Sequence, residues 1–272
     1  MIKFEINNEE HILPSSVTIQ NYVEIYKIKD LFSDDYFAAK LLSIVTNISI
    51  EDLLMSDYNQ VNYLASEVMK MIPIDKPEFV DRIEIDGIKY GFIPDWKDMT
   101  FAEFADLDTL TTKKRDEVLS NLHIIASIMY RPVTTEKSLH DYEIEKYDVK
   151  KMKERAEIFK NKLDIKYVLG AQFFFYQIRK QVFKLFPSVF DTEIIDMDKN
   201  ENVMDDEEIN PESNFQKAYG WFFILNRIAG NDYKNHKVIY ESTIMECLNQ
   251  LSYLVDYDRE QIRLQKKHNN IR

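Results

Sequence analysis

Apolar residues recur every three or four positions along most of this chain, the spacing that gathers them on one face of an α-helix. A clear example is the stripe formed by Val61, Leu64, Ala65, Val68 and Ile72, which ends just before a proline. Comparable stripes predict further helices in the ranges 19–26, 37–45, 101–107, 118–129, 148–160, 165–186, 215–225 and 244–255. Helices therefore make up most of the predicted structure.

Two short segments instead alternate apolar and polar residues, which is typical of half-buried β-strands. The central segment has predicted strands at 82–85 and 88–93 around Asp86-Gly87, a dipeptide that suits a two-residue hairpin turn. The N-terminal segment crosses Asn7-Asn8, and asparagine tolerates left-handed backbone geometry. We predict a mainly α (α+β) fold, with helical bundle-like units and small N-terminal and central β-hairpins.

Two predicted helices begin with the spacing of a capping box. Thr100 and Glu103 form the first and Thr243 and Glu246 the second. In this motif the hydroxyl and the carboxylate each accept a hydrogen bond from an amide that would otherwise lack a partner at the helix start. The first box lies within residues 83–133, the segment with the most complete set of turn, start and stop signals.

Changes in composition divide the chain into five parts. They are an N-terminal hairpin plus helices at 1–73, a central β-hairpin and helical pair at 74–147, long helices at 148–190, an acidic linker at 191–212 and a C-terminal helical unit at 213–272. Residues 134–147 are polar and acidic, so we interpret them as a connector. Residues 191–212 hold ten Asp or Glu and one Lys, and repulsion among like charges favours a solvated linker. Mimicry of nucleic acid, or docking to a basic partner, is the alternative for that stretch.

Composition excludes several classes of protein. Hydrophobic residues make up 45% of the chain and aromatic residues 13%, which is incompatible with general disorder. The net charge of −12 disfavours non-specific binding to nucleic acid. The single cysteine, Cys247, allows no internal disulfide and favours a reducing compartment, so the expected location is the cytoplasm. The longest strongly apolar uncharged run covers residues 167–178, too short for the roughly 20 residues of a membrane-spanning helix.

No recognised catalytic motif is present, and we predict no catalytic residue, cofactor or metal. One alternative is an enzyme that binds a divalent metal through the acidic residues near 95–108, which are Asp95, Asp98, Glu103, Asp106 and Asp108. Acidic residues in a first helical turn also stabilise the helix dipole, and their spacing matches no calcium loop. A helix-turn-helix in residues 215–254 is disfavoured because its second helix has few outward Arg or Asn residues to read bases.

Several side chains are candidates for contacts with a partner. The segment 165–186 is apolar on nearly every side and must be covered by its own domain or by another protein. Trp96 is expected to pack between the central hairpin and the helices, with an interface role as the alternative. Basic residues end the last helix, where cations also favour the helix dipole, and a phosphate-binding tail is the alternative. The candidate interface residues are Trp96, Phe173, Phe174, Phe175, Trp221, Arg259, Arg263, Lys266 and Lys267.

Four segments carry a resemblance to a known class of protein. They are the strand-Pro-helix opening from Phe4 to Ser15, and residues 91–104 (GFIPDWKDMTFAEF), 124–132 (IIASIMYRP) and 219–232 (YGWFFILNRIAGND). In these segments the chain resembles tailed-bacteriophage morphogenesis proteins of the baseplate-hub assembly or tail-assembly chaperone type. The frequent Asn, Ile, Lys and Asp also resemble the usage of an AT-rich phage genome, such as that of a Bacteroidetes or crAss-like phage.

The resemblance implies a non-enzymatic structural or assembly protein that binds other phage proteins during tail or baseplate morphogenesis. It implies tail, baseplate or neck components as partners, an oligomer or hetero-complex, and a location in the host cytoplasm during assembly. Retention in the virion as a tail or neck component, or as packaged cargo, is a further expectation.

Overall fold

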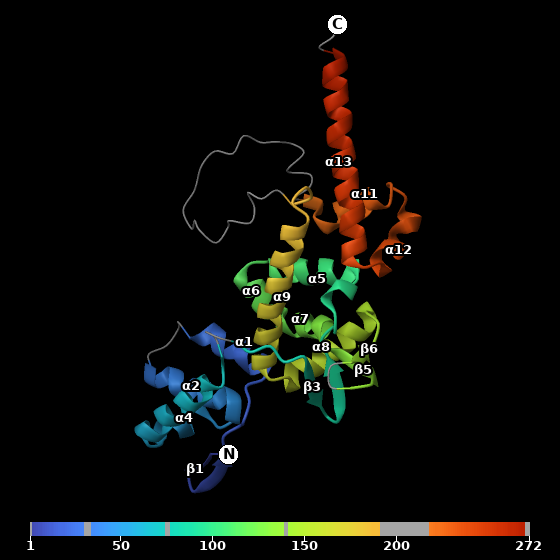
Figure 1. The fold of residues 1–272 in the computed structure, drawn as a ribbon. Helices are drawn as coiled ribbons and strands as arrows, with labels where there is room; N and C mark the ends of the chain where they lie inside the picture. Colours follow the sequence, from blue (N-terminus) through green and yellow to red (C-terminus); the bar gives the residue numbers. More distant parts are fainter. Residues whose placement is uncertain (1, 30–33, 74–76, 139–140, 191–217, 270–272) are drawn as a thin grey trace. The chain divides into compact units, whose positions relative to one another are not determined.

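The computed structural model describes residues 2–29, 34–73, 77–138, 141–190 and 218–269 (Figure 1). Within these residues it has 12 α-helices and two small antiparallel sheets, one of two strands and one of four. The prediction of a mainly α fold with some β structure is confirmed. The chain forms two compact units: unit 1 comprises residues 1–94 and 109–175, and unit 2 comprises 95–108 and 176–272. The predicted acidic linker, 191–212, lies outside the described residues.

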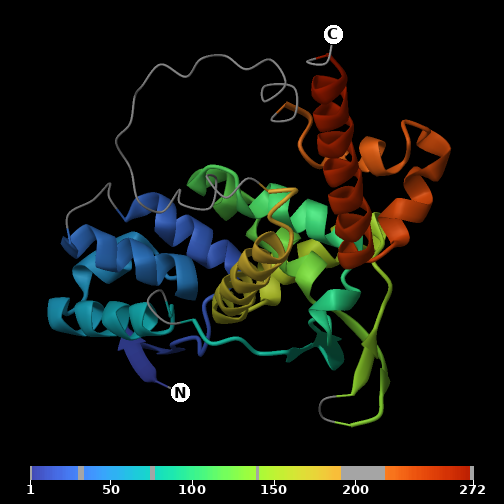
Figure 2. The ribbon, with the colours of Figure 1, turned by 45° about the horizontal axis from the view of Figure 1, so that its top comes forward.

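Unit 1 contains most of the helices. In Figures 1 and 2, helices α2 and α4 lie side by side within this unit. Helix α9 begins in unit 1 and ends in unit 2. Helix α5 (Phe101–Thr111) begins in unit 2, and its last three residues belong to unit 1. The helices that lie in unit 1 are α1 (Ile19–Ile28), α2 (Asp34–Thr46), α3 (Ile50–Met55), α4 (Tyr58–Lys70), α6 (Arg115–Ser120), α7 (Leu122–Met129), α8 (Val149–Lys162) and the first part of α9 (Ile165–Leu185).

Both predicted hairpins are confirmed. Strands β1 (Lys3–Ile6) and β2 (Glu9–Ile12) flank Asn7 and Asn8, whose φ angles are 52° and 63°. Strands β3 (Arg82–Ile85) and β4 (Ile88–Gly91) flank Asp86 and Gly87, whose φ angles are 52° and 77°. Two positive φ angles in a row give the turn whose twist matches that of the paired strands, as the sequence indicates.

The central sheet is larger than predicted, because part of the predicted connector 134–147 is β-structure. Strands β5 (Arg131–Glu136) and β6 (Tyr142–Ile144) extend the sheet in the order β3-β4-β5-β6. The connector prediction is therefore wrong for these residues. The prediction fails because the second half of β5 is exposed. Polar side chains there replace the apolar–polar alternation that marks a half-buried strand.

Aromatic side chains and a close backbone approach fix helix α9 in unit 1. The backbone at Glu78 passes so near Gly170 that a Cβ atom on that glycine would lie 2.0 Å from the Glu78 carbonyl oxygen. Next to this crossing, the rings of Phe79 and Phe174 stack with centroids 4.1 Å apart. The Phe92 ring meets both edge-on, at 5.2 and 5.6 Å. Residues 77–81 are thereby held against α9 and the sheet.

The hydroxyls of two buried tyrosines donate to backbone carbonyl oxygens on either side of the β3–β4 hairpin. The Tyr130 hydroxyl donates to the Val80 carbonyl oxygen at 2.6 Å, and the Tyr142 hydroxyl donates to the Phe92 carbonyl oxygen at 2.8 Å. Burial raises the pKa of Tyr142 to about 12, and it also raises the pKa of Tyr130. Both hydroxyls therefore stay protonated and able to donate across the physiological range.

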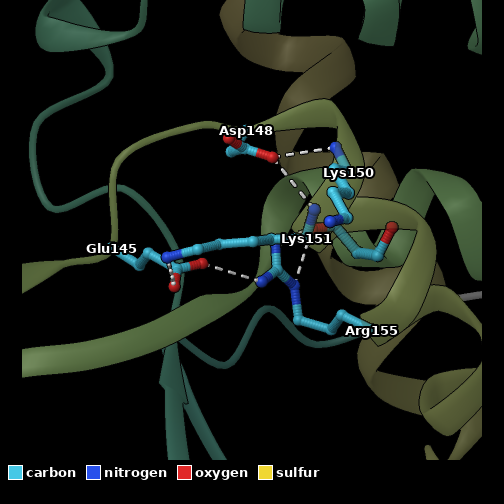
Figure 3. A network of polar contacts seen from close by, with 6 residues as sticks. Glu145, Asp148, Lys150, Lys151 and Arg155 are labelled. Atoms are coloured by element: carbon cyan, nitrogen blue, oxygen red, sulfur yellow. Dashed lines mark hydrogen bonds and ion pairs between the residues drawn. The ribbon is translucent and has the colours of Figure 1, made fainter.

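A buried arginine joins helices α7 and α8 (Figure 3). Arg155 is only 6% exposed, and its Nε and Nη2 atoms donate to the Ser127 carbonyl oxygen at 3.1 and 2.9 Å. Its Nη1 atom pairs with Glu145 at 3.1 Å, and Lys151 pairs with the same carboxylate at 2.7 Å. Asp148 caps the start of α8 by accepting from two backbone amides. Burial lowers the pKa of Arg155, while the Glu145 carboxylate opposes that shift.

Unit 2 is built around two capped helix starts. Its elements are the 3-10 turn η1 (Trp96–Asp98), α5 up to Asp108, the end of α9, α11 (Trp221–Ile228), the 3-10 turn η3 (Tyr233–Asn235), α12 (His236–Glu241) and α13 (Ile244–Asn269). Backbone bonds from Phe101 N to Ser242 O (2.9 Å) and from Ile244 N to Met99 O (2.8 Å) join the starts of α5 and α13. Residues 95–108, predicted to belong to the central part, therefore fold with the C-terminal helices.

Both predicted capping boxes are confirmed at this junction. The Thr100 amide donates to Glu103 at 2.9 Å, and the Glu103 amide donates to the Thr100 hydroxyl at 3.3 Å. The corresponding distances for Thr243 and Glu246 are 3.0 and 3.2 Å. Each box stabilises a helix start, and the backbone bonds between them set the two helices in register.

Candidate interaction surface

Three of the five carboxylates of the alternative metal site have separate roles in the fold. Asp95 accepts from the Lys97 amide at 3.0 Å and caps η1, and Glu103 belongs to its capping box. Asp108 is 8% exposed and accepts from Arg179 and, at 2.9 Å, from the Trp221 indole nitrogen. Within the described ranges, no group of three or more His, Cys, Asp or Glu side chains has the arrangement needed to hold a metal ion. Asp95, Glu103 and Asp108 are thus accounted for by the fold of unit 2.

Cys247 and His123 are each explained by packing in their own unit. Cys247 is 3% exposed, and burial raises its thiol pKa to about 12, so the thiol stays protonated at neutral pH. Its sulfur lies 3.7 Å from the Ile239 carbonyl oxygen. His123 belongs to unit 1. Its half-burial lowers its pKa and so favours the neutral ring. Each side chain is accounted for by packing in its own unit.

The predicted interface residues are placed in different environments. Phe175 is 1% exposed and Phe174 stacks on Phe79, whereas Phe173 is 53% exposed on the same helix. Trp96 is half-buried in η1, which lies beside α13 in unit 2, whereas the central hairpin that it is predicted to cover belongs to unit 1. An interface role for Phe174 and Phe175 would require their present packing to change.

Trp221 anchors three helices of unit 2. Its indole N–H donates to Asp108 of α5, and Arg179 of α9 donates to the same carboxylate. Its ring meets Phe101 and Phe104 of α5 edge-on, with centroids 5.6 and 5.4 Å apart. These contacts fix the start of α11. They therefore also set the direction in which the side chain of the next residue, Phe222, extends from the helix.

Beside this anchor, four rings form a continuous strip, which we call the aromatic strip: Tyr219, Phe222, His236 and Tyr240. Successive ring centroids are 6.4, 6.0 and 6.4 Å apart. Tyr219, Phe222 and Tyr240 are 50%, 51% and 41% exposed. His236 is oriented by Asn226, whose side-chain oxygen lies 3.1 Å from its Nε2 atom. Exposed aromatic residues are enriched at protein interfaces, because they bury much surface for little lost conformational freedom.

Sequence reasoning found Trp221 but missed the aromatic strip. The apolar spacing predicts that Tyr219 and Phe222 lie on the inward stripe of the helix over 215–225, and no pattern marks Tyr240. The structure buries Leu225 and half-exposes Phe222, because the capped start of α5 and Trp221 set the rotation of α11. A helical stripe alone does not reveal this rotation.

Among the residues that the structure describes, helix α13 is covered over its first half only. Ile244, Cys247, Leu248 and Leu251 are at most 3% exposed. We call residues 253–268 its distal half; there the exposed apolar residues are Tyr253 (62%), Tyr257 (50%), Ile262 (52%) and Leu264 (47%). In Figures 1 and 2 this red helix continues well beyond α11 and α12 of its own unit. The distal half therefore presents apolar surface that the described chain leaves exposed.

Contacts near the middle of α13 give the distal half a fixed direction. The hydroxyls of Ser188 and Ser252 are 2.6 Å apart, and Arg259 Nη2 donates to the Ser188 carbonyl oxygen at 3.3 Å. Arg227 of α11 pairs with Asp258 at 2.5 Å. The predicted basic residues Arg259, Arg263, Lys266 and Lys267 all lie on this exposed half.

Comparison with known proteins identifies no relative: no family model, no curated sequence and no solved structure matches the chain. No helix among the described residues is both long and apolar enough to span a membrane.

Proposed function

We propose that this chain is a bacteriophage assembly or structural protein that binds other phage proteins during tail or baseplate morphogenesis. The aromatic strip of unit 2 is the observation that carries this proposal. Three of its four rings are exposed, the rings are adjacent to one another, and the strip lies next to the internal anchor at Trp221. A preorganised set of aromatic side chains loses little freedom on binding, so it suits recognition of a protein surface.

The four segments that resemble phage morphogenesis proteins support the choice of partner class. One of them, residues 219–232, contains Tyr219 and Phe222 of the strip and Trp221 of the anchor. The partner is then a tail, baseplate or neck component, and binding takes place in the host cytoplasm. Retention in the virion, as a component or as packaged cargo, is the second form of the same proposal.

Capture from infected cells tests this proposal. The tagged full-length chain is expected to retain phage tail, baseplate or neck proteins, and Phe222→Ala combined with Tyr240→Ala is expected to lose them. The matched control is Tyr58→Ala combined with Tyr63→Ala, because these tyrosines of α4 are also exposed, at 58% and 55%, but lie in unit 1. Equal capture by both double variants would reject the aromatic strip as the binding surface.

Two further results would overturn the wider proposal. One is a chain that retains only host proteins, or none, from infected cells at several times after infection. The other is saturable binding of Mg²⁺ or Mn²⁺ that is lost in Asp98→Asn combined with Asp106→Asn. That second result would favour the metal-dependent enzyme.

A further inference from the structure

The distal half of α13 has a second stripe of side chains on the face opposite its buried one. The stripe consists of Tyr253, Tyr257, Glu260, Leu264 and Lys267, at successive spacings of 4, 3, 4 and 3 residues. Tyr253 follows the buried Ile244 by nine residues, which is about 2.5 turns and therefore the opposite side of the helix. The rings of Tyr253 and Tyr257 stack, with centroids 6.1 Å apart. Spacing of this kind is the one by which two helices pack along their length.

Charge is segregated along this distal half. Residues 253–262 contain three acids, Asp256, Asp258 and Glu260, and one base, Arg259, for a net charge of −2. Residues 263–268 contain three bases and no acid, for a net charge of +3 with histidine neutral. The helix therefore carries a negative segment followed by a positive one.

We propose that the stripe on the distal half of α13 pairs with the same stripe of a second copy of this chain, running antiparallel and centred at the level of residue 262. In that arrangement each positive segment lies against the negative segment of the other copy. Residue 256 of one copy is then level with residue 268 of the other, so Asp256 is adjacent to Lys267. Asp256 and Lys267 are 11 residues apart, about three turns, and so lie on the same flank of the stripe. Two symmetric ion pairs result.

Charge complementarity selects this occupant over others. A parallel pair in register would set Asp256 against Asp256 and Lys267 against Lys267, and like charges in contact are unfavourable. A uniformly acidic or uniformly basic partner would match one segment and oppose the other. Antiparallel helices also align their dipoles favourably. A second copy is therefore the partner that satisfies both segments.

The size of the surface implies a weak dimer. Sixteen residues of helix, 253–268, extend for about 24 Å. Contact along one face of that length falls among the small interfaces that form transient complexes. The dimer is thus expected to depend on concentration, and to be stabilised wherever an assembly holds several copies together. This inference concerns a different surface from the aromatic strip and does not rest on it.

A charge exchange tests the pairing. Sedimentation velocity of the full-length chain over a range of concentrations is expected to show a monomer–dimer equilibrium. Asp256→Lys alone, or Lys267→Asp alone, is expected to raise the dissociation constant about tenfold or more, because each places like charges together. The double variant is expected to restore the dimer, since the exchanged charges are again opposite. Within one helix the two positions are about 16 Å apart, so recovery cannot come from pairing inside a single chain.

Matched controls separate this effect from changes in folding or net charge. Lys237→Glu combined with Glu241→Lys exchanges an exposed pair on α12, where the charges are 3.9 Å apart, and is expected to leave the dimer unchanged. Asp256 also pairs with Arg259 at 3.5 Å, but both side chains are more than half exposed, so loss of that pair has little effect on the fold. Tryptophan fluorescence reports whether unit 2 is intact in each variant, because Trp96 and Trp221 both lie in unit 2.

The outcomes are decisive in either direction. A chain that stays monomeric at all concentrations, or single variants that dimerise like the unchanged chain, would overturn the proposal. A dimer weakened by the single variants but not restored by the double variant would overturn the antiparallel arrangement. Loss of phage partners in the Phe222→Ala, Tyr240→Ala double variant has no bearing on these measurements, so this inference and the proposed function can fail separately.

Discussion

Helices α8 and α13 are both amphipathic and rich in charge, but among the described residues only α8 has a buried stripe that runs from its first turn to its last. In α8 the buried residues Met152, Arg155, Ala156 and Phe159 recur from the first turn to the last. In α13 the buried stripe ends at Leu251. Unit 1 thus buries even an arginine, Arg155, and supplies it with hydrogen-bond and ion-pair partners. Unit 2, in contrast, leaves about half of its longest helix exposed among the described residues. The difference indicates that unit 1 buries its charged helix against its own core, whereas unit 2 leaves apolar surface of α13 exposed among the described residues.

The largest expected effect is on the crossing that holds α9 in unit 1. Gly170→Ala would place a Cβ atom 2.0 Å from the Glu78 carbonyl oxygen, and a backbone atom has little freedom to move away. Overpacking a core typically costs about 1–3 kcal/mol, and we expect a larger loss of stability here. Chemical denaturation followed by circular dichroism measures it. Phe173→Ala, on the exposed side of the same helix, is the control and should change stability far less.

Helix α13 offers the direct test of covered against exposed surface, because one stripe contains both kinds. Leu251 is 3% exposed and Ile262 is 52% exposed. Leu251→Ala should cost about 2–5 kcal/mol by leaving a cavity, whereas Ile262→Ala should stay within about 0.5 kcal/mol. Unfolding monitored by tryptophan fluorescence reports unit 2, at a concentration where the chain is monomeric. A similar cost for both variants would mean that Ile262 is covered in solution, and the contrast with α8 would be lost.

Arg155 tests the closed character of unit 1. Arg155→Lys keeps the charge but removes the fork that donates twice to the Ser127 carbonyl oxygen while also pairing with Glu145. Hydrogen bonds that involve a charged group are worth about 1.5–3 kcal/mol, so we expect a loss in that range. Arg263→Lys on α13 is the matched control: its pair with Glu260 is 2.9 Å long but mostly exposed, and such pairs contribute little. Equal losses would contradict the distinction between the two helices.

Much of this fold was predictable because local signals dominate it. The hairpin at Asp86-Gly87 follows from a dipeptide that accepts two positive φ angles, and the helix starts at Thr100 and Thr243 follow from capping-box spacing. These features depend on residues within four positions of one another. The stripes at three- and four-residue spacing predicted most helices for the same reason.

What the sequence did not reveal depends on contacts between distant residues. Strand β5 forms because Gly91 and Tyr90 offer an edge some 40 residues earlier in the chain, at the register Tyr90↔Pro132 and Gly91↔Arg131. The membership of residues 95–108 in unit 2 depends on two backbone bonds to residues near 243. The aromatic strip depends on the rotation that Trp221 gives to α11. None of these pairings leaves a local pattern.

At neutral pH the smallest effect we predict is that of titration, which appears only as an alkaline loss of stability located in unit 1. The pKa of Tyr142 is raised from 10.0 to about 12 by burial, and that of Tyr130 is raised for the same reason. A group whose folded pKa lies above its unfolded pKa binds the proton more tightly when folded. Its contribution is therefore complete below pH 10 and is lost as the pH rises from there through the folded pKa.

Each tyrosine in that window contributes a slope of at most about 1.4 kcal/mol per pH unit, since one proton is lost on unfolding. Tyr142→Phe should reduce the slope between pH 10 and 12, although it also removes the hydrogen bond to the Phe92 carbonyl oxygen and so lowers stability at pH 8. Tyr253→Phe is the control for loss of a tyrosine hydroxyl, because its ring is 62% exposed and belongs to unit 2, outside the unit whose slope is measured. Hydrogen exchange resolved by segment distinguishes unit 1 from unit 2, where burial of Cys247 raises its pKa and adds its own alkaline sensitivity from about pH 9. A slope that persists in Tyr142→Phe and Tyr130→Phe together would show that the buried hydroxyls do not control the alkaline unfolding of unit 1.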